Sequence, residues 1–85
     1  MTTKPASIVQ EHPSDSLESI AYSSVSSIPS TEPNDLNRLG YHVWRWLVNK
    51  EGSLEEAIHE SGARIGISKQ EALRIISEAL KKRGL

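Results

Sequence analysis

Apolar residues recur at the spacing of an α-helix over residues 35–50, but they occupy two faces rather than one. The first face consists of Leu36, Leu39, Val43, Trp46 and Leu47, and the second of Tyr41, Trp44 and Val48. Asn34 is a suitable N-cap after Pro33, and Gly52 ends the pattern. A helix that is apolar on two sides is usually buried on two sides. We therefore expect a second cover from the N-terminal segment, a second copy of the chain or a partner.

Two further helices are predicted over residues 54–65 and 69–82, and each has a marked start. Ser53 with Glu56, and Ser68 with Glu71, form two S-x-x-E capping boxes. Gly62 falls inside the first of these helices, where a glycine costs up to about 1 kcal/mol relative to alanine. We therefore expect Gly62 to mark a close helix–helix approach. The stripe expected to be buried on the last helix consists of Ala72, Ile75, Ile76, Ala79 and Leu80.

Residues 1–33 differ in composition from the rest of the chain. They contain all four prolines and nine serines, but few large apolar side chains. Such a segment buries too little apolar surface to offset the entropy of ordering it, so we expect a disordered tail. One patch offers the alternative of a short helix, because Leu17, Ile20 and Ala21 lie at helical spacing. The predicted fold class is all-α, with a three-helix domain over residues 34–85 behind this tail.

The charge is divided between these two parts. Residues 1–33 hold one lysine against four acidic residues, whereas residues 34–85 hold nine Lys and Arg against seven Asp and Glu. The formal net charge of −1 therefore combines a mildly acidic tail with a mildly basic domain. Nucleic-acid-binding domains often show a larger positive excess. The chain has no cysteine, which excludes disulfides and thiolate metal sites.

The segment over residues 62–68 resembles the turn of helix-turn-helix and winged-helix DNA-binding domains. In that family a small residue lies four positions before the turn glycine, and an apolar residue and a capping serine follow that glycine. The matching positions here are Gly62, Gly66, Ile67, Ser68, Ala72 and Ile75. The resemblance covers residues 53–85 and does not include the β-hairpin wing, which we do not expect after Leu85. It implies a helix-turn-helix-like domain in which two helices joined by a short turn cross at a steep angle.

The resemblance also implies that the helix over residues 69–82 is a recognition helix. Its start would face base edges or nearby phosphates, and its basic end would hold the DNA backbone. The candidate DNA-binding residues are Lys69, Gln70, Arg74, Lys81, Lys82 and Arg83. Against this, Glu71 and Glu78 on the same helix would meet phosphates unfavourably. The alternative is the solvated face of an amphipathic helix, with Glu78 and Lys82 as an ordinary i, i+4 ion pair.

The second apolar face of the helix over residues 35–50 indicates a different class, a protein–protein adaptor. Tyr41, Trp44 and Val48 are the candidate partner-binding residues, because aromatic side chains often anchor interfaces. The alternative is that they lie partly buried at the domain edge. Two hypotheses stay open: a DNA-binding regulator or accessory protein, and a non-enzymatic adaptor that uses this helix and the tail. The expected partners are accordingly DNA, another protein or a second copy of the chain.

Catalytic and cofactor chemistry has little support in the sequence. Glu55 and His59 share one helix face, but two ligands do not make a metal site. We see no nucleophile–base pair and no phosphate-binding glycine loop. We therefore expect no enzymatic activity, cofactor, metal or small-molecule substrate. No apolar run approaches the roughly 18 residues that span a bilayer, and no signal peptide is evident, so we expect a cytoplasmic protein without a membrane partner.

Overall fold

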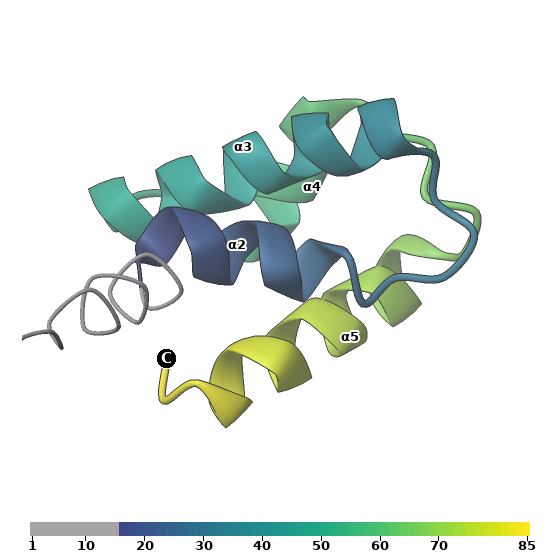
Figure 1. Ribbon diagram of the computed structural model, residues 1–85. Coiled ribbons are helices and arrows are strands. Elements are labelled where there is room, and N and C mark those ends of the chain that lie inside the picture. Colours follow the sequence, from purple (N-terminus) through teal and green to yellow (C-terminus); the bar gives the residue numbers. More distant parts are fainter. Residues whose placement is uncertain (1–15) are drawn as a thin grey trace, which may run out of the picture.

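The computed structural model describes residues 16–85, which form four α-helices and no strand. The helices are α2 (Leu17–Val25), α3 (Pro33–Asn49), α4 (Leu54–Ser61) and α5 (Lys69–Lys82). Helices α2 and α3 form an antiparallel hairpin, α5 lies along another side of α2, and α4 packs against α3 (Figure 1). The prediction of an all-α fold is confirmed. The domain has one helix more than the three predicted.

The additional helix is α2, which forms inside the segment expected to be a disordered tail. Its N-cap is Ser16, whose side-chain oxygen accepts a hydrogen bond from the backbone N–H of Ser19 at 3.1 Å. Ile20, Ala21 and Val25 are buried. Most helical stability in proteins comes from such packing rather than from intrinsic propensity, and a serine-rich composition therefore does not exclude a helix. Residues 1–15 of the predicted tail lie outside the described residues, and residues 26–32 connect α2 to α3.

Helices α2 and α3 approach each other closely at Gly40. A Cβ atom added to Gly40 would lie 2.4 Å from Cδ1 and 2.6 Å from Cε1 of Tyr22. The Tyr22 ring therefore lies directly on the α3 backbone, on the side of the first apolar face. The second face keeps Tyr41 and Val48 exposed, so within residues 16–85 the expected second cover is not formed. Helix α3 itself starts at Pro33, with Glu32 rather than Asn34 in the N-cap position.

Helix α4 ends four residues earlier than predicted. Its start is confirmed, since the Ser53 hydroxyl accepts a hydrogen bond from the Glu56 N–H at 3.1 Å. Gly62 is its C-cap, in the left-handed conformation with φ of 65°, and a Cβ added there would meet nothing within 4 Å. The prediction that Gly62 marks a close helix approach is wrong. This glycine is present because the left-handed cap favours a residue without a Cβ.

The connection between α4 and α5 consequently spans residues 62–68, not the three-residue turn that the predicted helix boundaries leave. Gly66 has a φ of 67°, and its α-carbon faces the α2–α3 connection: an added Cβ would lie 3.1 Å from the Ser30 carbonyl oxygen. The Thr31 hydroxyl also donates to the Ile65 carbonyl at 3.5 Å. The two connections therefore contact each other, and both lie at one end of the helices (Figure 1).

Helix α5 has the predicted bounds and completes the core. The Ser68 hydroxyl accepts a hydrogen bond from the Glu71 N–H at 3.1 Å, as its capping box predicted. Helix α5 packs more extensively against α2 than against α4. Its position is therefore set largely by α2, which the sequence offered only as the alternative to a disordered tail. The buried core residues are Ile20, Ala21, Val25, Ile28, Leu39, Val43, Leu47, Ile58, Ile65, Ala72, Ile76 and Leu80.

Candidate interaction surfaces on α3 and α5

The outer face of α3 carries the three predicted partner-binding residues together. Tyr41 and Val48 are 47% and 46% exposed, and Trp44 is half-buried against the core. The Tyr41 and Trp44 ring centroids are 6.0 Å apart. Exposed side chains of this size at i, i+3 and i+7 form an apolar seam along one helix. We refer to Tyr41, Trp44 and Val48 as the α3 seam.

Two arginines flank the α3 seam on one side. The Arg45 guanidinium lies 5.8 Å from the centroid of the Tyr41 ring, within the range of a cation–π contact. Arg38, one heptad earlier, has its Nη1 3.7 Å from Oδ1 of Asp35. Asp35 is the only carboxylate of α3, and it is buried. The exposed surface of α3 is therefore apolar along the seam and positive beside it.

Arg38 and Arg45 are not among the partner-binding residues predicted from the sequence. They are seven residues apart in the sequence, but the sequence does not show which side of the helix is exposed. It therefore does not show that both arginines flank exposed apolar side chains. Asp35 lies in the first turn of α3, where a carboxylate suits the positive end of the helix dipole. In the structure it also faces Arg64 from the α4–α5 connection, with 4.0 Å between Oδ2 and Nε.

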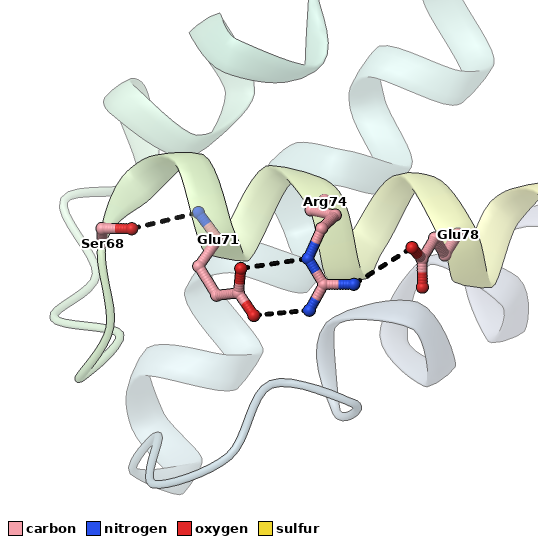
Figure 2. A network of polar contacts seen from close by, with 4 residues as sticks. All are labelled: Ser68, Glu71, Arg74 and Glu78. Carbon is pink, nitrogen blue, oxygen red and sulfur yellow. Dashed lines mark hydrogen bonds and ion pairs between the residues drawn. The ribbon is translucent and has the colours of Figure 1, made fainter.

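The centre of the predicted recognition helix, α5, is a network of ion pairs (Figure 2). Nε and Nη2 of Arg74 donate to the two carboxylate oxygens of Glu71, and Nη1 donates to Oε2 of Glu78 at 3.0 Å. Arg74 is thus held by two carboxylates one turn away in either direction. The expected pair of Glu78 with Lys82 is not formed, because Glu78 faces Arg74 instead. A nucleic acid would have to displace both glutamates to reach this guanidinium.

This network shifts the protonation equilibrium of Glu71. The hydrogen bonds from Arg74 lower the pKa of Glu71 below its ordinary value. A depressed pKa in the folded state means that the pair contributes to the stability of the fold at neutral pH, and that this contribution is lost as the pH falls through the folded-state pKa.

We expect Arg74→Gln to raise the pKa of Glu71 towards the ordinary glutamate value, as measured by a carboxyl NMR titration. The matched variant Lys82→Gln should leave this pKa unchanged, and an unchanged value in Arg74→Gln would contradict the assignment.

The remaining predicted DNA-binding residues are spread along α5 rather than gathered at one point. Near the helix start, Nζ of Lys69 lies 3.9 Å from Oε2 of Glu55, and Gln70 is exposed. At the helix end, Lys81 and Lys82 are exposed and make no ion pair within residues 16–85. Arg83 turns towards α2, where its Nη2 donates to the Ser23 hydroxyl at 2.8 Å. No sequence pattern connects residues 60 positions apart, so this contact could not have been predicted.

The described part of the chain also bears on metal and membrane sites. No group of three or more His, Cys, Asp or Glu side chains in residues 16–85 has the arrangement to hold a metal ion. Glu55, considered above with His59, faces Lys69. None of the helices in the same range is long and apolar enough to cross a membrane.

Comparison of the chain with protein-family models, with curated proteins and with solved structures finds no match.

Proposed function

We propose that this protein is a non-enzymatic adaptor, and that the α3 seam binds an amphipathic helix of another protein. The observation that carries this proposal is the exposure of Tyr41 and Val48, each nearly half accessible, on either side of Trp44. Large apolar side chains gathered on one exposed face are typical of interaction sites. Tyrosine and tryptophan are also the residues that most often dominate binding energy at interfaces.

The spacing of the seam supports a helical partner. Residues at i, i+3 and i+7 match the a, d and a positions of a heptad, which is the pattern by which one helix docks along another. Arg38 and Arg45 then occupy successive flanking positions, where charged residues select the partner. A second copy of α3 would present the same two arginines and no exposed carboxylate. The charge therefore favours a different chain whose helix carries acidic residues beside its apolar stripe.

A pair of synthetic helices tests this proposal. One peptide of about three heptads has leucine along its seam and glutamate at the flanking positions, and the other has lysine in place of glutamate. In an amide NMR titration we expect the glutamate peptide to shift signals of residues 37–48, and the lysine peptide to cause no shifts there. Tyr41→Ala should weaken binding about tenfold, because it removes an exposed aromatic anchor. His59→Ala, an exposed substitution on α4, is the matched control.

Two outcomes would contradict the adaptor proposal. Equal binding of both peptides would show that the arginines do not select an acidic helix. Shifts centred outside α3 would place the interaction on another surface. Sedimentation of the protein alone measures self-association. A dimer that dissociates on Tyr41→Ala substitution would replace the acidic partner by a second copy.

DNA binding through α5 is the second candidate function. The observation in its favour is the exposed, unpaired state of Lys81 and Lys82 within the described residues. In this proposal these lysines hold phosphates, and Lys69, Gln70 and Arg74 lie nearer the bases. Because Arg74 is bound by two glutamates, we rank this function below the adaptor.

Titration of the labelled protein with a mixed-sequence DNA duplex tests the DNA proposal. We expect amide shifts over residues 68–83 at low salt that shrink as the salt concentration rises, since phosphate contacts release counterions. The double variant Glu71→Gln/Glu78→Gln should bind more tightly because it frees Arg74. The absence of shifts at low salt would exclude this function, because even non-specific binding is strong under those conditions.

A further inference from the structure

A groove of about 250 Å³ lies between α5 and the end of α2, with an excess of positive charge. Its polar lining comes from two serines of the α2 side and four charged residues of α5, namely Ser23, Ser27, Arg74, Glu78, Lys82 and Arg83. Three cations therefore face one carboxylate. Arg74 is shared by Glu78 and Glu71, as described above, so that this network carries a net charge of −1 beside the groove. Lys82 makes no ion pair within residues 16–85, and the only hydrogen bond of the Arg83 side chain there goes to the neutral Ser23 hydroxyl.

We propose that this groove binds a phosphate monoester and that Ser27 itself carries the phosphate. The modification is a transfer of the γ-phosphoryl group of a nucleoside triphosphate by a protein kinase. The Ser27 Oγ–phosphorus bond forms, the bond from the γ-phosphorus to its bridging oxygen breaks, and the hydroxyl proton passes to the base of the kinase. The products are the nucleoside diphosphate and phosphoserine at position 27. Its charge of about −1.5 to −2 at neutral pH matches the two uncommitted cations, Lys82 and Arg83.

The surroundings of the four serines in this region single out Ser27. Ser24 is buried, and its hydroxyl donates to the Ala21 carbonyl at 2.8 Å. The Ser23 hydroxyl already accepts from Arg83. Ser26 is exposed but does not line the groove. Ser27 is exposed and lines the groove, and its hydroxyl makes only a long hydrogen bond of 3.5 Å to the Ser23 carbonyl, so a phosphate there displaces little.

The Glu78 carboxylate and the end of α2 both oppose a phosphate at this point. The carbonyl end of a helix carries a partial negative charge, which falls off within the last turn. Here the last carbonyls already accept hydrogen bonds: Tyr22 from the Ser26 N–H, Ser23 from the Ser26 hydroxyl, Ser24 from the Ser27 N–H and Val25 from the Ile28 N–H. Two full positive charges in the groove outweigh this reduced partial charge. Phosphorylation at residue 27 therefore adds charge-assisted contacts between α2 and α5.

Thermal unfolding of defined phosphoproteins tests the proposal. Phosphoserine is incorporated at position 27 or, as the matched control, at position 26, in the full chain and in its Lys82→Ala/Arg83→Ala variant. We expect phosphoserine 27 to raise Tm by about 4 °C in the unsubstituted chain and to give no rise in the double variant. Phosphoserine 26 should give no rise in either chain. A fall in Tm with phosphoserine 27, or an equal rise in both chains, would overturn the proposal.

Two further measurements distinguish a phosphate attached to Ser27 from a free phosphate ion bound in the groove. If inorganic phosphate stabilises the Ser27→Ala variant as much as phosphoserine 27 stabilises the chain, the groove serves a free anion and the assignment to Ser27 is overturned. Mass spectrometry of the protein isolated from the cells that produce it should find a phosphoryl group on Ser27. Phosphate on other serines alone, or none, would overturn the proposal.

Discussion

Replacing Val25 with aspartate is expected to unfold the domain. Val25 is 1% exposed and lies in the core with Ile20 and Ala21. A carboxylate at this position would be buried without a partner, and such substitutions cost about 4 kcal/mol or more. A domain of this size has a total stability of roughly 5 kcal/mol, so the loss consumes most of it.

Circular dichroism and the amide NMR spectrum of the full chain measure this effect. The control is Ser26→Asp, one residue further on, where the side chain is exposed and the new carboxylate stays in water. We expect Ser26→Asp to retain a cooperative unfolding transition close to that of the unsubstituted chain. If Val25→Asp also retained a cooperative unfolding transition, with spectral changes confined to residues 17–28, α2 would not be part of the core. The core would then consist of α3, α4 and α5.

Gly40→Val is expected to produce the second largest loss, about 3 kcal/mol of unfolding free energy. The added Cβ alone would lie 2.4 Å from the Tyr22 ring, and the three nearest atoms all belong to that ring. The ring is rigid, so it has to leave the α3 backbone as a whole and give up its packing. Even Gly40→Ala should destabilise, although a helix interior otherwise gains about 1 kcal/mol from that change.

A double-mutant cycle isolates this contact. In a Tyr22→Ala background the space at position 40 is open, and we expect Gly40→Ala to become stabilising by up to about 1 kcal/mol. Gly62→Ala is the comparison for a glycine with no neighbour within 4 Å, where only the left-handed backbone opposes the change, at about 1–2 kcal/mol. If Gly40→Val cost no more than Gly62→Ala, the close packing of α2 on α3 would be disproved. Chemical denaturation gives all of these free energies.

Features that depend on neighbouring residues were predictable from the sequence. Ser53 and Ser68 mark the starts of α4 and α5 correctly, because a cap is formed by side chain and backbone three residues apart. The helical spacing of Tyr41, Trp44 and Val48 could also be read directly, whereas the exposure of Tyr41 and Val48 could not. Gly62 was misread because glycine is compatible both with a close helix contact and with a left-handed cap. Only the absence of a nearby helix distinguishes the two.

Features that depend on distant partners were not predictable. The helical spacing of Leu17, Ile20 and Ala21 made α2 an alternative, but its serine-rich composition favoured a tail, because the burial of Ile20 and Ala21 against other helices cannot be read from the sequence. The engagement of Arg74 was partly visible, since Glu71 and Glu78 lie three and four residues away. Whether Arg74 binds both glutamates or only one of them depends on side-chain rotamers, which cannot be read from the sequence.

The placement of α2 between α3 and α5 also has a consequence for synthesis of the protein. A nascent chain can form the α2–α3 hairpin early, because these helices are neighbours in sequence. The other side of α2 stays exposed until α5 has left the ribosome, since Ala72, Ile76 and Leu80 are the core residues that α5 contributes late. A chain in which α2 and α3 have paired before α5 docks therefore displays an apolar helix surface. Such partly folded states are prone to aggregation, so a chain truncated before α5 should aggregate.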